Sequence, residues 1–360
     1  MRRRVLLAAP LIAAPLLLPA VPASAQPAGV VLEEFLVPSG AGIQLYLRNK
    51  RQEGATAARA DRVVLCVHNG TFPASTSFDL PAGGVSWMDY MAGRGFDVWC
   101  LDLRNYGRST REAAMAQPPA GAPLTRGQDA LADIAAAAAF IREKRGVPKL
   151  VHLGWGWGAG LMARFATENA SLVDRLVLYA PEWLRQGAAP ASTAATASTA
   201  GTNGAGAAPP LPSYRSLTRA EVRARWVEGV PDNRRAALFP AGWYEHWADT
   251  TFAADPEGAR QVPSVLRVPN GPLADAAAFW DAGRSFYESA RITVPTLVTL
   301  GEWDREAPPA QALALFQSMT AAPAKRLSLL GEGTHGIMLE RNRGALFQAV
   351  QVFLEEALTT

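Results

Sequence analysis

Hydrophobic residues in this chain gather in short unbroken runs that alternate with helix-like segments. Two strand-like stretches lie within residues 30–51, and continuous apolar runs follow within 62–70, 96–109, 151–166, 174–183, 294–306 and 325–336. Apolar strands without polar alternation are typical of a parallel sheet that helices cover on both faces. The pattern therefore predicts an α/β fold with a mostly parallel central sheet of about eight strands flanked by helices.

The alternation stops near residue 183 and resumes near residue 291, which divides the predicted core into residues 26–183 and 291–360. Residues 184–290 are expected to form an inserted helical lid that opens with a Gly/Ala/Ser/Thr/Pro tract at 187–212. Within the first part of the core, residues 125–146 read as a long helix, with Thr125 as its N-cap and Gly146 beyond its end.

The first 25 residues have the features of a secretory signal peptide. Arg2, Arg3 and Arg4 precede an apolar run, and Ala23-Ser24-Ala25 is a small-residue cleavage pattern before Gln26. We expect an exported protein, periplasmic or secreted, whose mature chain has no membrane span. Cleavage removes three arginines, so the formal charge of +3 falls to about zero and the pI near 9.0 does not indicate a nucleic-acid partner.

The two cysteines and the histidines do not have the spacing of a metal site. Cys66 and Cys100 lie in apolar strand-like runs, and both a disulfide and two buried free thiols are compatible with the sequence. His152 falls inside a buried strand and is expected to be a core histidine with its hydrogen bonds satisfied, and His246 has no second ligand nearby. No metal and no cofactor is predicted.

The segment Gly154-Trp155-Gly156-Trp157-Gly158 connects an apolar strand to a helix through a tight turn. Asp304 follows a later strand, in "LGEWDRE", and His335 follows the last one, in "GEGTHG". This order of elements and residues resembles the α/β-hydrolase fold family of serine esterases and lipases, over nearly all of residues 30–358. In that family a nucleophile stands at the strand–turn–helix elbow, followed along the chain by an acid and a histidine.

The resemblance implies roles for particular residues here. His335 would be the general base and Asp304 the group that orients it, while the backbone N–H groups of Trp157 and Gly70 would form an oxyanion hole. Gly156 stands at the vacant position of the nucleophile, so the triad is degenerate and no acyl-enzyme can form there. The sequence does not show whether this glycine is natural or introduced.

Three further features bear on this site. Asn69 and Asn105 replace glycines of the family's turns, and asparagine is expected to preserve those turns by tolerating positive φ. Ser109, Thr71 and Ser75 lie on nearby loops as possible substitute nucleophiles. In the predicted lid, the aromatic residues Trp243, Tyr244 and Trp247 are expected to contribute to the substrate pocket.

Two functions from different classes are compatible with these residues. The first is hydrolysis of an apolar or aromatic ester or lactone by a water molecule that His335 activates. The alternative is a non-catalytic pseudoenzyme that binds a small apolar ligand in the same pocket. The retained Asp304 and His335 favour the first, and the absent nucleophile at Gly156 favours the second.

Overall fold

A computed structural model describes residues 29–357 of the chain, apart from residues 41, 55–57 and 186–209. The predicted signal peptide, residues 1–25, lies outside the described residues, as does most of the low-complexity tract at 187–212. Among the described helices, none combines the length and the apolar character needed to cross a bilayer.

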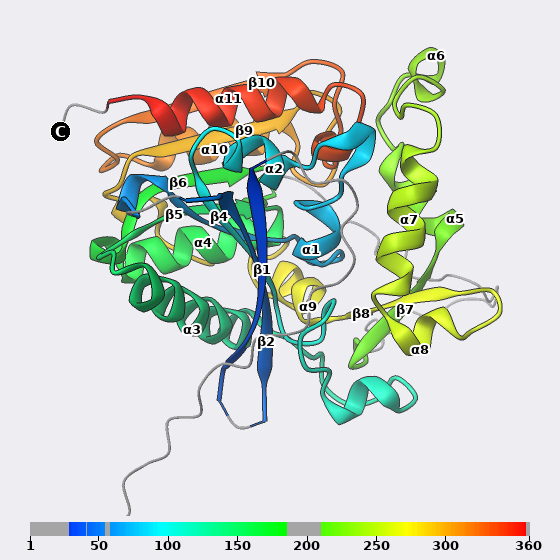
Figure 1. Ribbon diagram of the computed structural model, residues 1–360. Coiled ribbons are helices and arrows are strands. Elements are labelled where there is room, and N and C mark those ends of the chain that lie inside the picture. Colours follow the sequence, from blue (N-terminus) through cyan, green and yellow to red (C-terminus); the bar gives the residue numbers. More distant parts are fainter. Residues whose placement is uncertain (1–28, 41, 55–57, 186–209, 358–360) are drawn as a thin grey trace, which may run out of the picture.

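An eight-stranded sheet forms the centre of the molecule (Figure 1). Its strands are β1 (Val30–Pro38), β2 (Gln44–Gln52), β3 (Val63–Val67), β4 (Asp97–Asp102), β5 (Leu150–Trp155), β6 (Val173–Tyr179), β9 (Thr296–Gly301) and β10 (Lys325–Leu330). Their spatial order is β1-β2-β4-β3-β5-β6-β9-β10, with β1, β2 and β4 paired antiparallel and all later neighbours parallel. The predicted fold class is confirmed.

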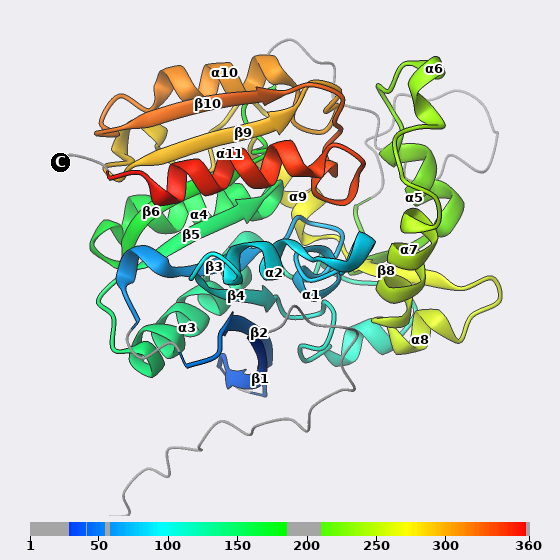
Figure 2. The same cartoon turned by 45° about the horizontal axis from the view of Figure 1, so that its top comes forward.

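Helices cover both faces of this sheet, as Figures 1 and 2 show. One face carries α3 (Gly127–Arg145), α4 (Trp157–Glu168) and α10 (Pro309–Ser318), and the other carries α2 (Trp87–Ala92) and α11 (Arg343–Glu355). Every residue of β3, β5 and β9 is buried as a result. Short 3₁₀ helices lie at Ala60–Arg62, Ala82–Gly84, Ala113–Ala116, Ala170–Leu172, Ser289–Arg291 and Ile337–Leu339.

The inserted segment between β6 and β9 lies beyond the carboxyl ends of the parallel strands (Figure 2). It contains α5 (Arg219–Trp226), α6 (Asp232–Arg235), α7 (Trp243–Ala253), α8 (Pro256–Ala259) and α9 (Gly271–Ala278). The expectation of a purely helical insertion was incomplete, because β7 (Tyr214–Thr218) and β8 (Val265–Pro269) form a two-stranded antiparallel sheet. The segment meets the core partly through α7, which packs on α1 (Ala74–Ser77).

The start of α3 differs from the prediction. Thr125 is not the N-cap: it has a φ of 57°, and its hydroxyl bonds to the Asn105 side chain at 2.9 Å. The helix begins at Gly127, and Asp129 accepts the N–H of Arg126 at 3.0 Å. Its other end is as predicted, because Gly146 adopts a φ of 63°, where glycine carries no steric penalty.

Two predictions about the core have different outcomes. Cys66 and Cys100 are register neighbours on β3 and β4, and both are buried free thiols.

His152 is fully buried on β5 as expected, but the expectation of satisfied hydrogen bonds was wrong. Neither of its ring nitrogens has a partner among the described residues, and burial lowers the pKa of His152 to about 3. Its surroundings, which include Phe165 at 5.0 Å between ring centroids, offer apolar contact instead.

Candidate active site

The turn between β5 and α4 keeps the backbone of a nucleophile elbow. Gly156 stands at its apex with φ 58° and ψ −122°, a conformation that side chains rarely adopt. The flanking glycines are required by close approach. A Cβ on Gly154 would lie 2.4 Å from the Gly158 carbonyl oxygen, and one on Gly158 would lie 2.2 Å from that of His68. Strand and helix therefore meet as the predicted elbow requires.

The structure brings Asp304 and His335 together at this apex. The Nδ1 atom of His335 lies 3.0 Å from Asp304 Oδ2. Asp304 is almost fully buried, and its Oδ1 accepts the N–H groups of Glu306 and Ala307 at 2.9 and 2.8 Å. These bonds fix the carboxylate, which in turn fixes the orientation of the imidazole ring.

The loop that carries His335 is held by two aromatic side chains from the neighbouring strands. The indole N–H of Trp155 and the hydroxyl of Tyr179 both donate to the His335 carbonyl oxygen, at 2.9 and 2.6 Å. Beyond His335, Glu340 accepts the N–H of Thr334 at 3.0 Å and the indole N–H of Trp226, on α5, at 2.7 Å. The sequence analysis did not identify these supporting residues, because their roles depend on contacts between distant elements.

The imidazole of His335 lies closer to the elbow than a side chain at the apex would permit. A Cβ on Gly156 would lie 2.8 Å from His335 Nε2 and 3.0 Å from the Cβ of Asn69. A serine at position 156 would thus require the ring to shift by a few tenths of an ångström. The glycine leaves Nε2 facing the bare apex, and this nitrogen has no hydrogen-bond partner among the described residues.

Two more carboxylates surround the histidine. Glu306 Oε2 lies 3.9 Å from His335 Nε2, and Glu306 is also bonded at 2.7 Å to Arg225 of α5. Burial alone would lower the pKa of His335, but the negative charges of Asp304, Glu306 and, less strongly, Glu182 outweigh it and raise the pKa to about 9. At neutral pH the ring is therefore mainly the imidazolium. Glu306, two residues after Asp304, is a site residue that the sequence analysis missed.

The expected oxyanion donors lie beside the apex. Neither the N–H of Gly70 nor that of Trp157, the first residue of α4, donates to an acceptor within the described part of the chain. A Cβ on Gly70 would lie 2.5 Å from Pro272 and 3.6 Å from the Trp157 Cβ, so this loop and the helix start are in close contact. Free backbone donors in this position can stabilise a developing oxyanion.

The two asparagines preserve their turns in different ways. Asn105 has a φ of 69°, as predicted. The same expectation was wrong for Asn69, which is not among the residues with positive φ. Its side-chain oxygen instead accepts the N–H groups of Thr71 and Phe72 at 3.0 and 2.9 Å, and so closes the turn.

Aromatic side chains of the inserted segment pack against Phe72, which follows the loop of Asn69 and Gly70. Phe72, next to the oxyanion loop, contacts the rings of Trp155, Trp226 and Trp247, with centroids 6.2, 6.0 and 4.8 Å away. Tyr244 packs against Trp226 and Trp247. Of the three predicted pocket residues, Trp243 has other neighbours: its ring stacks with Arg343 and lies against Gly83. The cover is closely packed, since Trp155, Trp226 and Trp247 are all buried.

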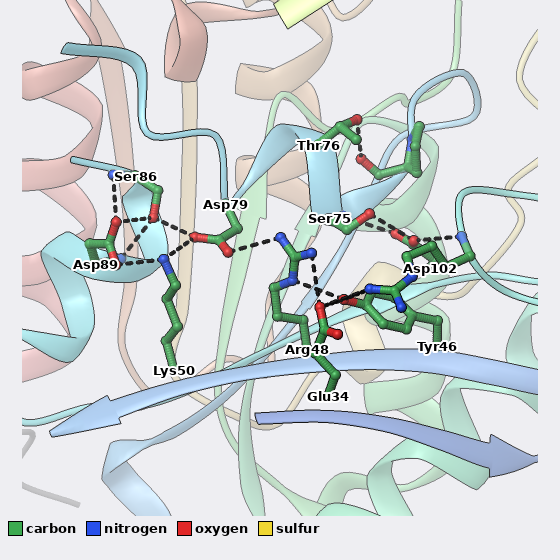
Figure 3. Close-up of polar contacts among 12 residues, drawn as sticks. Glu34, Tyr46, Arg48, Lys50, Ser75, Thr76, Asp79, Ser86, Asp89 and Asp102 are labelled. Atoms are coloured by element: carbon green, nitrogen blue, oxygen red, sulfur yellow. Dashed lines mark hydrogen bonds and ion pairs between the residues drawn. The ribbon is translucent and has the colours of Figure 1, made fainter. Parts of the chain in front are cut away.

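The possible substitute nucleophiles are occupied elsewhere. Figure 3 shows Ser75 bonded to Asp102, with the hydroxyl 2.8 Å from Oδ2. The Ser109 hydroxyl donates to the Asp102 carbonyl oxygen and accepts the N–H of Tyr46 at 2.8 Å. The Thr71 hydroxyl lies 3.5 Å from the guanidinium of Arg215, a half-buried side chain whose pKa is lowered to about 10 by desolvation. Ser75 and Ser109 brace the loop after β4.

The described residues contain no group of three or more His, Cys, Asp or Glu side chains placed to hold a metal ion.

Comparison with known proteins gives a consistent result. The sequence profile of the alpha/beta hydrolase fold matches residues 63–341, whereas no curated protein sequence matches. Among solved structures, a 2-hydroxy-6-oxo-6-phenylhexa-2,4-dienoate hydrolase from a Rhodococcus strain is 16% identical, with a TM-score of 0.60 over 91% of this chain and 100% of the other. An enol-lactonase from Burkholderia xenovorans is 17% identical, with a TM-score of 0.52 over 89% and 100%. A meta-cleavage product hydrolase from Pseudomonas fluorescens, a mutant complexed with acetates, is 14% identical, with a TM-score of 0.57 over 90% and 98%.

Proposed function

Because this chain belongs to the alpha/beta hydrolase fold family, we propose that it hydrolyses an activated ester or lactone without a covalent intermediate. A water molecule at the bare apex of Gly156 is the nucleophile, and His335 removes its proton. The observation that carries this proposal is the pairing of His335 with Asp304 at 3.0 Å, directed at an apex beside two free N–H donors. The predicted export of the protein would place this activity in the periplasm or outside the cell.

The reaction follows from the positions of these groups. Neutral His335 takes a proton from water at Nε2 while the oxygen attacks the carbonyl carbon, and the resulting oxyanion accepts from Gly70 and Trp157. The imidazolium then returns the proton to the leaving alkoxide, as in the second half of a serine hydrolase cycle. Each oxyanion donor typically contributes about 10²–10³ in rate. Without a serine, an overall acceleration of roughly 10³–10⁴ over water is the expected scale.

The charge of His335 determines the pH dependence of this reaction. General-base catalysis needs the neutral ring, and a pKa of about 9 leaves only roughly 1% of it neutral at pH 7. Turnover should therefore rise close to tenfold per pH unit between pH 7 and 8.5, and level off above 9. The substrate is expected to be small or apolar, because the rings of Phe72, Trp226 and Trp247 pack together and Trp226 lies against Gly336, the residue after His335.

The test compares the parent protein with Gly156→Ser and His335→Ala. p-Nitrophenyl acetate and a strained lactone are the substrates, and a serine-directed phosphonate is the covalent probe. We expect alkaline turnover by the parent that His335→Ala removes, with no phosphonate label, while Gly156→Ser becomes labelled and faster. Ser75→Ala is the matched control, because this serine is bonded to Asp102 and should not contribute.

A second candidate function is supported by the charge of the same histidine. A ring that is mainly imidazolium at neutral pH is a poor base, so a non-catalytic protein that binds a small ligand is the alternative. If the parent and His335→Ala are equally inactive at every pH, while Gly156→Ser gains label and turnover, hydrolysis by the parent is ruled out. The scaffold would then be an intact hydrolase without its nucleophile, and the binding function would stand.

A further inference from the structure

The central sheet ends in an open edge at β10. Among the described residues, no strand pairs with the outer side of β10. Figure 2 shows β10 at the end of the sheet, with α10 and α11 packed beside it. Every residue of β10 is at least partly exposed, whereas every residue of β9 is buried. An edge strand of this kind presents unpaired backbone groups to which another strand can bind.

The bonds between β10 and β9 show which backbone groups face the open edge. The carbonyl groups of Ala324 and Leu330 accept N–H groups from β9 and from the residue after it, both at 2.8 Å. Backbone groups alternate in direction along a strand, so even-numbered residues of β10 face β9 and odd-numbered residues face outward. Leu327 and Leu329 therefore direct their N–H and C=O groups toward the open edge.

Exposed apolar side chains gather on the elements around this edge. Five large apolar side chains of the described residues are exposed, and three of them lie on β10, α10 and α11. These are Leu329, Leu313 and Val352, which are 54%, 46% and 55% exposed. A single exposed apolar residue needs no explanation, but several on adjoining elements indicate an interaction surface.

The two ends of β10 carry opposite charges. Lys325 and Arg326 begin the strand, while Glu302 and Glu332 lie at its far end, where Glu302 accepts the N–H of Glu332 at 2.8 Å. Arg326 is already paired with Glu356, but Lys325 donates to a backbone carbonyl of α10 at 2.8 Å rather than to a carboxylate. Glu332 forms an exposed pair with an arginine of α6, which contributes little.

We propose that β10 pairs antiparallel with β10 of a second copy of this chain, so that two eight-stranded sheets become continuous. With the two-fold axis at Ser328, Leu327 of each chain exchanges backbone hydrogen bonds with Leu329 of the second copy, because both face outward. The same register brings Lys325 beside Glu332 of the second copy. The surface is self-complementary, since the basic end of each strand meets the acidic end of the other.

The position of the lysine distinguishes this pairing from other strand additions. A lysine on an edge strand commonly prevents pairing. Lys325 is the first residue of β10 and leaves the middle of the strand uncharged. In an antiparallel pair of two copies it meets acidic residues, whereas a parallel pair would bring like charges together. The proposal does not depend on the proposed hydrolysis.

The first measurement is the mass of the purified protein by light scattering after size-exclusion chromatography. We expect the mass of two chains, falling toward that of one chain on dilution. Hydrogen exchange resolved to single amides then locates the contact. The N–H groups of Leu327 and Leu329 should be protected only in the dimer, while that of Ser328, which faces β9, should be protected in both states.

Leu329→Lys tests the apolar part of the surface. It places a charge in the middle of the contact and should weaken dimerisation by roughly 10- to 100-fold. Val262→Lys is the matched control, because Val262 is 98% exposed on the loop between α8 and β8 and lies outside the proposed contact. Because both side chains are exposed, both variants should fold, and their melting temperatures check this.

A charge exchange tests the register. Lys325→Glu should weaken dimerisation by up to about tenfold, and combining it with Glu332→Lys should restore the affinity. A protein that is monomeric throughout the micromolar range would overturn the proposal, as would equal effects of Leu329→Lys and Val262→Lys. A dimer in which Leu327 and Leu329 exchange freely, or a charge exchange without recovery, would show that the copies do not pair through β10 in this register.

Discussion

Two buried clusters of charged residues in this protein are built in opposite ways. The first lies between β2 and the region of α1 and α2 (Figure 3), where Lys50 Nζ is 2.7 Å from both Asp79 and Asp89. Arg48 bridges Asp79 at 3.0 Å and Glu34 at 3.1 Å. The second is the elbow, where His335 meets Asp304 on one side and a bare apex on the other.

The comparison shows how a structural cluster differs from a functional one. In the first cluster each cation is in direct contact with carboxylates, and Ser86 donates further bonds to Asp79 and Asp89. At the elbow, Nε2 of His335 and the N–H groups of Gly70 and Trp157 have no acceptor within the described part of the chain. Unsatisfied buried donors are costly, and they are expected where a ligand or transition state supplies the missing acceptor.

The largest expected effect is on stability, in the first cluster. Lys50→Met leaves two buried carboxylates without their shared cation and should lower the free energy of unfolding by about 3–5 kcal/mol. Urea denaturation followed by tryptophan fluorescence measures it. Lys149→Met is the matched control, because its pair with Asp174 is 43% exposed on the lysine side and should contribute less than about 1 kcal/mol. Equal losses in both variants would contradict the distinction between the clusters.

A smaller effect is expected from Glu306→Gln at the elbow. Removing this negative charge should lower the pKa of His335 from about 9 toward 6.5, and move the rise of hydrolysis to lower pH. In the parent, protonated His335 contributes fully to the free energy of unfolding below about pH 6.5, and this contribution is lost as the pH rises through about 9. In Glu306→Gln the free energy of unfolding should therefore fall less between pH 6.5 and 9. Histidine NMR and denaturation between pH 6 and 10 measure both changes.

Glu302→Gln provides the control for that substitution. Glu302 is an exposed residue of the same loop, and its carboxylate accepts the N–H of Glu332 at 2.8 Å rather than facing the histidine. It should leave the His335 titration unchanged. If both glutamine variants shift the titration equally, a general charge effect is responsible and Glu306 has no special position.

The smallest expected effect is in the contact between the inserted segment and the histidine loop. Trp226→Phe removes the 2.7 Å bond to Glu340, a buried acid whose pKa is raised to about 7 mainly by burial. The free energy of unfolding should fall by about 1 kcal/mol, because the variant loses one hydrogen bond but keeps most of the aromatic packing. Trp243→Phe is the control, and thermal denaturation is the measurement. A larger loss in Trp243→Phe would show that Trp226 does not anchor the segment.

The sequence predicted the structure well where the local pattern of residue types and the space available around the backbone point to the same conformation. The apolar runs predicted the sheet, and Gly154 and Gly158 predicted an elbow because backbone atoms leave no room for a Cβ at either position. It failed where a residue has two ways to satisfy the same turn. Asn69 closes its turn with a side-chain bond rather than positive φ, and the N-cap of α3 is Arg126, whose N–H bonds to Asp129, rather than Thr125. The inserted segment was predicted less well, because β7 and β8 pair across 46 intervening residues.

The sequence by itself determined the fold class, the tight glycine-rich turn at Gly156, and the chain order of Gly156, Asp304 and His335, because each is encoded in local spacing. Only the tertiary structure decided the state of His335. Its charge depends on Glu306 and Glu182, its position on Trp155 and Tyr179, and its cover on Trp226 and Trp247, which come from separate elements. Electrostatic and packing effects act through space over a few ångströms, and neighbours in space are not neighbours along the chain.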